Sequence, residues 1–92
     1  MEFKGSKGKW FSSYINGSWL IQDLESYQEG FRTTIAEVYY FNDGKDTAEA
    51  NALLISKSPE MLEMLKECYK YLPYEGVMRK KVDNLIKQAT EL

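Results

Sequence analysis

The sequence predicts an α+β fold, in which a three-stranded antiparallel meander is followed by two to three helices, the last two forming an α-hairpin. An Asn-Gly pair at positions 16 and 17 separates two stretches rich in aromatic and β-favouring residues. That pair is a strong hairpin signal, because both central residues of a type I′ turn need positive φ. Residues 31–41 form a third stretch dense in Thr, Ile, Val and Tyr. Helix start and stop signals follow from Asp46 onward.

The two-residue turn sets the register of the first two predicted strands, residues 9–15 and 18–24. In this register Tyr14 lies opposite Trp19, and side chains alternate between the two faces of the sheet. One face then carries the aromatic residues Trp10, Tyr14 and Trp19. The other carries Phe11, Ile15, Leu20 and Leu24. We expect the helices to pack on the aliphatic face and the aromatic face to stay wholly or partly free.

The segments that follow the second predicted strand alternate between turns and helices. Residues 26–30 predict a polar loop, and residues 42–46 predict a turn. Asp46 with Glu49 three residues later resembles a capping box, which predicts a helix to about Lys57. Ser58 followed by Pro59 predicts a second helix start.

The second and third predicted helices run from Ser58 to about Leu72 and from about Gly76 to Glu91, and Pro73 separates them. Each has one apolar stripe at helical spacing. The first stripe is Met61, Leu65, Cys68 and Leu72, and the second is Met78, Val82, Leu85, Ala89 and Leu92. These stripes predict an antiparallel α-hairpin in which Cys68 is a buried structural thiol.

Length and composition predict a single domain over residues 1–92, with residues 1–8 as a flexible lead-in. Twelve basic against fourteen acidic residues give a net charge of −2, which argues against non-specific DNA binding. No apolar run reaches the ~18 residues of a membrane span, and no apolar stretch near the N-terminus resembles a signal peptide. The expected location is therefore the cytosol.

The chain has no histidine and a single cysteine. This composition excludes a Ser-His-Asp or Cys-His nucleophile and leaves almost no room for an ordinary zinc site. No pair of carboxylates stands out as an acid–base pair. We therefore expect a non-enzymatic protein without cofactor or metal.

Aromatic and basic residues are the best candidates for a binding site. Flat aromatic rings accept nucleobases, and an arginine grips phosphate with two parallel hydrogen bonds. The candidate ligand-binding set is Trp10, Tyr14, Trp19, Arg32, Arg79 and Lys80. The alternative is structural: strands favour aromatic residues in any case, and charge runs often form a solvated helix face.

Two segments carry a resemblance to a known group of proteins. Residues 48–55 (AEANALLI) and 58–65 (SPEMLEML) resemble a motif of small, mostly uncharacterised phage and prophage proteins. The resemblance covers about residues 46–66, and Gly8-Lys9-Trp10 corresponds to a Gly-Pro-Trp element of that group, with Lys in place of Pro. It implies a phage or prophage origin and carries over no catalytic residue.

These observations lead to two functional hypotheses. The first is a phage binding protein that counteracts host defence in the host cytosol by sequestering a small nucleotide-type signal. The second is a protein-interaction module, such as an acidic inhibitor of a host defence protein or nuclease, or a phage assembly accessory factor. Under either hypothesis we expect a homo-oligomer, because a chain of 92 residues is short for a stable monomer and its last helix is rich in apolar residues.

Overall fold

A computed structural model of the chain describes residues 2–31, 33–39 and 44–91. They group into two compact units. The sheet unit is Gly8–Pro59, and the helical unit combines Met1–Lys7 with Glu60–Leu92.

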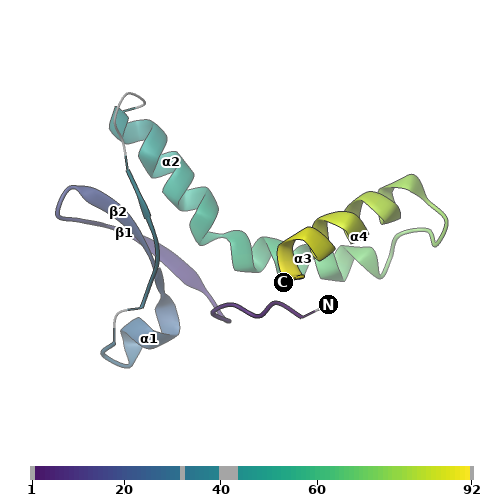
Figure 1. Cartoon of the computed structure of the whole chain (residues 1–92), viewed down its shortest axis with the longest axis horizontal. Coiled ribbons are helices and arrows are strands. Elements are labelled where there is room, and N and C mark those ends of the chain that lie inside the picture. Colours follow the sequence, from purple (N-terminus) through teal and green to yellow (C-terminus); the bar gives the residue numbers. More distant parts are fainter. Residues whose placement is uncertain (1, 32, 40–43, 92) are drawn as a thin grey trace. The chain divides into compact units, whose positions relative to one another are not determined.

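The sheet unit contains the predicted antiparallel meander (Figure 1). Its strands are β1 (Trp10–Ile15), β2 (Ser18–Asp23) and β3 (Thr34–Val38), in the order β1-β2-β3. Tyr14 pairs with Trp19 as predicted. Asn16 and Gly17 have φ values of 53° and 85°, the positive angles that a type I′ turn requires. The predicted fold class and register are therefore confirmed.

A short helix, α1 (Leu24–Gln28), replaces part of the predicted polar loop. Its N-cap is Asp23, whose carboxylate accepts a hydrogen bond from the Glu25 N–H at 3.1 Å and one from the Ser26 hydroxyl at 3.0 Å. These bonds satisfy donors at the helix start, so the chain turns into a helix as soon as β2 ends. The prediction of a polar loop at residues 26–30 was therefore wrong, because Asp23 caps a helix that occupies the first part of this segment.

Three longer helices follow the sheet: α2 (Gly44–Ser56), α3 (Ser58–Tyr69) and α4 (Val77–Thr90). The predicted helices are thus all present. Asp46 does not cap α2 as predicted but lies inside its first turn, where a carboxylate is stabilised by the positive end of the helix. Residues 40–43, which the sequence assigns to the end of the third strand and to a turn, lie outside the described residues.

Helix α2 covers one face of the sheet. Its buried residues, Ala48, Ala52 and Ser56, are spaced by four and form one stripe. On the sheet, Ile21 is fully buried, with 0% of its surface exposed. Because Ile21 and Trp19 point to the same side of β2, α2 covers the face that the sequence identifies as aromatic.

The expectation that the helices pack on the aliphatic face was therefore wrong for α2. The reason is the size of the residues in the middle of the aromatic face. Ile21 pairs with Ser12 on one side and with Ala36 on the other, both small. This leaves room for the alanine stripe of α2 to approach the sheet closely, with Ile21 filling the space between them.

The opposite face of the sheet carries Phe11 and Gln22. The ring of Phe11 meets the ring of Tyr27 from α1 edge to face, with centroids 5.1 Å apart. Gln22 is buried, and its amide oxygen accepts a hydrogen bond from the Ser13 hydroxyl at 3.1 Å. This face is therefore partly polar, and its buried polar group is paired.

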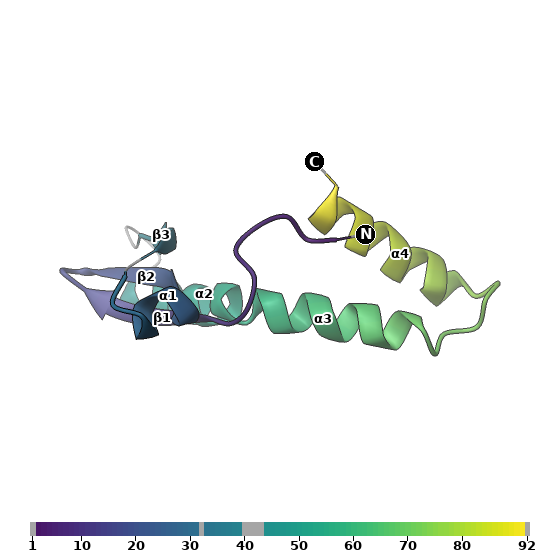
Figure 2. The ribbon, with the colours of Figure 1, turned by 90° about the horizontal axis from the view of Figure 1, so that it is seen from below.

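In the helical unit the chain reverses between α3 and α4, and Figure 2 shows α4 running back in the direction opposite to α3. Ile86 and Thr90 of α4 are buried, and the Thr90 hydroxyl donates to the Ile86 carbonyl at 2.8 Å. No residue of α3 is fully buried. Cys68 is exposed, so the prediction of a buried thiol was wrong.

The close approach of α2 to the sheet can be tested by enlarging one alanine. Ala52→Leu should lower the free energy of unfolding by about 1–3 kcal/mol, because Ala52 has no exposed surface and the extra atoms must displace neighbours. The matched control is Ala50→Leu, at an exposed position of the same helix, which should change it by less than about 0.5 kcal/mol. Urea denaturation followed by circular dichroism measures both. Equal effects of the two substitutions would contradict the packing described here.

Candidate functional site

Among the six candidate residues, Tyr14 and Trp19 are brought into ring contact. Trp10, Tyr14 and Trp19 belong to the sheet unit. Arg79 and Lys80 belong to the helical unit. Arg32 lies outside the described residues.

Tyr14, Trp19 and Lys45 form a cluster that we call the aromatic corner. The rings of Tyr14 and Trp19 lie 5.3 Å apart between centroids, tilted by 52°. The Lys45 ammonium lies 5.2 Å from the centroid of the Tyr14 ring, within cation–π range. Tyr14 is 43% exposed, whereas Trp19 is half-buried. The corner thus presents an aromatic surface and a positive charge to solvent.

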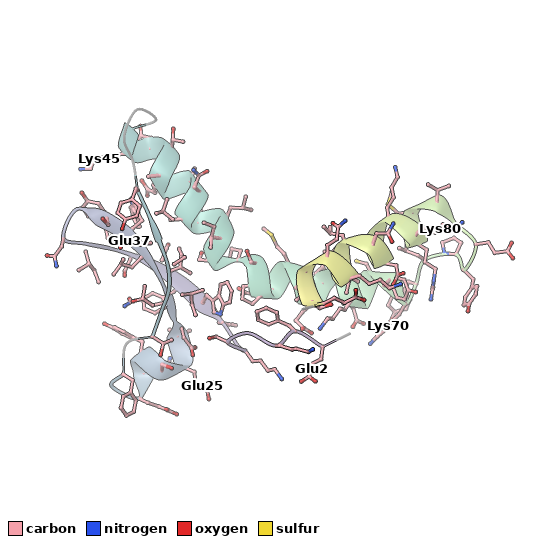
Figure 3. The ribbon with its side chains drawn as sticks, viewed as in Figure 1. Glu2, Glu25, Glu37, Lys45, Lys70 and Lys80 are labelled. Carbon is pink, nitrogen blue, oxygen red and sulfur yellow. The ribbon has the colours of Figure 1, made fainter. Side chains whose placement is uncertain are left out.

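The corner results from how three elements meet at the turn end of the sheet. Tyr14 and Trp19 are cross-strand partners next to the Asn16-Gly17 turn. Lys45 belongs to the first turn of α2, and Figure 3 shows it at the start of that helix. Sequence reasoning missed Lys45, because only the docking of α2 on the aromatic face brings it to Tyr14.

Trp10 shares the aromatic face but lies at the far end of β1 from Tyr14. The two residues are four positions apart in the extended strand, a span of roughly 13 Å. Trp10 is half-buried. It is therefore not part of the aromatic corner.

Two other described aromatic residues of the sheet unit, Tyr27 and Tyr39, make local contacts. Tyr27 packs on Phe11, as described above. The Tyr39 hydroxyl donates a hydrogen bond to the Glu37 carboxylate at 3.0 Å. This hydrogen bond, together with the nearby negative charge, raises the pKa of Tyr39. Tyr27 is thus engaged through its ring and Tyr39 through its hydroxyl.

Arg79 binds the chain's own backbone. Its guanidinium donates hydrogen bonds to the carbonyl oxygens of Tyr69 at 3.1 Å and of Leu72 at 3.0 Å. It also lies over the rings of Tyr69, at 4.0 Å from the centroid, and of Tyr74, at 4.9 Å. Arg79 thereby binds the carbonyl of the last residue of α3, which also accepts the Leu72 N–H at 3.3 Å, and the carbonyl of Leu72 beyond that helix.

One of the three cations at residues 79–81, Arg79, therefore has a structural role. A cation near the start of a helix opposes that helix's own dipole. Arg79 instead interacts with the carbonyl end of the preceding helix, where positive charge is stabilising. Lys80 is exposed, near the connection between α3 and α4 (Figure 3). Of the two candidate cations, Lys80 is the more accessible.

The described residues contain no group of three or more His, Cys, Asp and Glu side chains that could hold a metal ion. Among the helices in the described part of the chain, none combines the length and the apolarity needed to cross a membrane.

Replacing Arg79 should destabilise the helical unit. Arg79→Gln loses two hydrogen bonds to carbonyl groups and the contacts with two rings, so the free energy of unfolding should fall by about 1–3 kcal/mol. Lys80→Gln makes the same charge change at the exposed neighbour and should have an effect below about 0.5 kcal/mol. Urea denaturation measured at 222 nm compares them. If Lys80→Gln lowers the free energy of unfolding as much as Arg79→Gln does, the loss of positive charge explains both effects, and the contacts of Arg79 do not stabilise the unit.

Comparison of the chain with protein-family models, with curated proteins and with solved structures found no match.

Proposed function

We propose that this protein is a non-enzymatic binding protein that sequesters a small, anionic, nucleotide-type ligand at the aromatic corner. The observation that carries the proposal is the combination of an exposed Tyr14 ring, the neighbouring Trp19 ring and the Lys45 ammonium. A nucleobase stacks on such rings, and a phosphate pairs with the ammonium. Binding of this kind needs no catalytic group.

The position of α2 limits the size of the ligand. The helix covers the middle of the aromatic face, where Ile21 is fully buried. The accessible aromatic surface is therefore the turn end of the sheet, beside Tyr14. This favours a single nucleotide-sized ligand over an extended nucleic acid, in keeping with the net charge of −2.

The biological setting of the proposal comes from the sequence. Residues 46–66 resemble small phage and prophage proteins, and a phage protein that sequesters a nucleotide signal would oppose a host defence that depends on that signal. The proposed site of action is accordingly the host cytosol.

A nucleotide panel tests the proposal. Thermal shift with mono-, di- and cyclic nucleotides should identify a ligand, because a compound that binds only the folded state raises its melting temperature. For that ligand, Tyr14→Ala and Trp19→Ala should each weaken binding roughly ten- to a hundredfold. Isothermal titration calorimetry measures the affinities.

Two variants control this experiment. Lys45→Ala should lower the affinity for the anionic ligand. Lys9→Ala, an equal charge change at another exposed lysine of the sheet unit, should leave the affinity unchanged. If Trp19→Ala does not fold, Trp19 is a packing residue. The affinities of Tyr14→Ala and Lys45→Ala then test whether the ligand binds at the aromatic corner. A panel in which no nucleotide raises the melting temperature refutes the ligand proposal.

The second candidate is a protein-interaction module, and the outer surface of α2 favours it. Leu53 and Leu54 are both more than half exposed and lie on the side of α2 away from its buried alanine stripe. Adjacent exposed leucines are a feature of docking surfaces. The partner proposed in this case is a host defence protein or nuclease, or a phage assembly protein.

If the protein is an interaction module, substitutions on the exposed leucines of α2 should prevent binding of its partner. Replacement of both Leu53 and Leu54 by Lys should abolish capture of a host or phage protein that the wild-type chain retains in a quantitative pull-down. Asn51→Lys adds a charge at another exposed position of α2 and should leave capture unchanged. A partner that both variants retain equally does not use this surface.

A further inference from the structure

The connection between α3 and α4 carries the most exposed large apolar side chains in the described part of the chain. Tyr74, Tyr71 and Val77 are 86%, 80% and 71% exposed, and no other large apolar side chain of the described residues reaches these values. Met78, which follows Val77 in the first turn of α4, is more than half exposed. Figure 2 shows that this connection forms one end of the helical unit. Four apolar side chains that are close in sequence are therefore presented to solvent at that end.

Arg79 defines the shape of this connection. Its hydrogen bonds to the carbonyl oxygens of Tyr69 and Leu72 join the first turn of α4 to the end of α3. Tyr74 lies over the guanidinium, with the ring centroid 4.9 Å away. The two acceptors are uncharged carbonyl groups, so Arg79 retains its positive charge in this position.

Two lysines border the exposed apolar side chains of α4. Residues three and four positions apart are neighbours on a helix. Lys81 is therefore a neighbour of both Met78 and Val77, and Lys80 is a neighbour of Val77. Both lysines are exposed, and within the described residues neither forms an ion pair. Their ammonium groups thus lie beside the apolar side chains and remain available to an anionic partner.

Positive charge is concentrated in this part of the chain. Residues 71–82 contain three cations and one carboxylate, Glu75, a net charge of +2 in a chain whose net charge is −2. Lys70 lies just outside this range and pairs with Glu67 at 3.6 Å, so it adds little. An anionic partner is therefore favoured at this end of the helical unit, although the chain as a whole is acidic.

We propose that this surface, which we call the cationic tip, binds the surface of a membrane that contains anionic lipids. The cationic tip consists of Tyr71, Tyr74, Val77, Met78, Lys80 and Lys81. Tyrosine rings favour the headgroup region of a bilayer, and aliphatic side chains gain free energy by reaching the acyl boundary. Lysines are attracted to the negative surface potential of anionic lipids.

The aliphatic side chains distinguish a membrane from a nucleic acid as the partner. A single-stranded nucleic acid stacks on tyrosines and pairs with lysines, but its backbone leaves Val77 and Met78 in contact with water or with charge. A bilayer surface accommodates both kinds of side chain. The association is peripheral and needs no membrane-spanning helix. It involves the helical unit, so it does not depend on a ligand at the aromatic corner of the sheet unit.

Co-sedimentation with lipid vesicles tests the proposal. The protein should pellet with vesicles of phosphatidylcholine and phosphatidylglycerol but not with phosphatidylcholine alone, and added salt should release it. Lys80→Gln combined with Lys81→Gln should lower the partition coefficient roughly thirtyfold, because each lysine near an anionic surface contributes a factor of about five. The control combines Lys4→Gln with Lys9→Gln, the same charge change at exposed lysines outside the tip, and should leave partitioning unchanged.

A second pair of variants tests the apolar part of the tip. Tyr71→Ser should lower the partition coefficient roughly fivefold, because the ring no longer enters the headgroup region. Phe31→Ser removes an aromatic ring of the sheet unit that is also more than half exposed, and it should leave partitioning unchanged. Circular dichroism should show native helix content in Tyr71→Ser, since this side chain is almost fully exposed.

A fluorescent label reports which part of the chain meets the lipid. Val77→Cys in a Cys68→Ser background allows an environment-sensitive fluorophore to be attached at position 77 alone, because the chain has one cysteine. Its emission should shift to shorter wavelength when phosphatidylglycerol-containing vesicles are added. The same label attached through Asn51→Cys, at an exposed position of α2, should show no shift.

Three results overturn the proposal. The first is a wild-type protein that does not pellet with phosphatidylglycerol-containing vesicles. The second is an equal loss of partitioning in the two double lysine variants, which would mean that binding depends on total charge and not on the tip. The third is binding of a single-stranded oligonucleotide through Lys80 and Lys81 without binding of vesicles, which would assign the tip to a nucleic acid.

Discussion

The close approach of α2 to the sheet is the packing contact on which the sheet unit depends. A helix can approach a sheet this closely only where both surfaces are small. On the helix, Ala48 and Ala52 are buried at adjacent turns. On the sheet, Ile21 is flanked by Ser12 and Ala36. Ile21 lies between these small residues and is the largest fully buried apolar side chain of the sheet unit.

The same contact determines which aromatic side chains stay accessible. Because α2 starts at the turn end of the sheet and covers its middle, Tyr14 remains partly open and gains Lys45 as a neighbour. Trp10, on the same face, lies at the other end of β1. A packing requirement thus produces the aromatic corner, since the helix that forms the interior of the unit also supplies the cation.

The helical unit is organised differently. Its chain reversal is held by Arg79, which joins the end of α3 to the start of α4 through two carbonyl groups and two rings. The apolar faces of the helices are only partly covered within the unit.

Local signals in the sequence determined the secondary structure and the register. Asn16-Gly17 defines a turn whose geometry few other residue pairs adopt, so the pairing of Tyr14 with Trp19 follows without any tertiary information. Proline and the spacing of apolar residues similarly locate α3 and α4. The short helix α1 was missed, although its Asp23 cap is also a local signal.

Tertiary structure alone decided which faces are covered and which charged groups meet aromatic rings. Both sheet faces carry enough apolar residues to pack under a helix, and the choice depends on the fit of Ala48 and Ala52 against Ile21. Lys45 and Tyr14 are 31 positions apart in the chain. Hydrophobic periodicity likewise identified Cys68 as part of an apolar stripe but not that its side of the stripe is open. Periodicity records which residues share a face, whereas burial depends on what packs against that face.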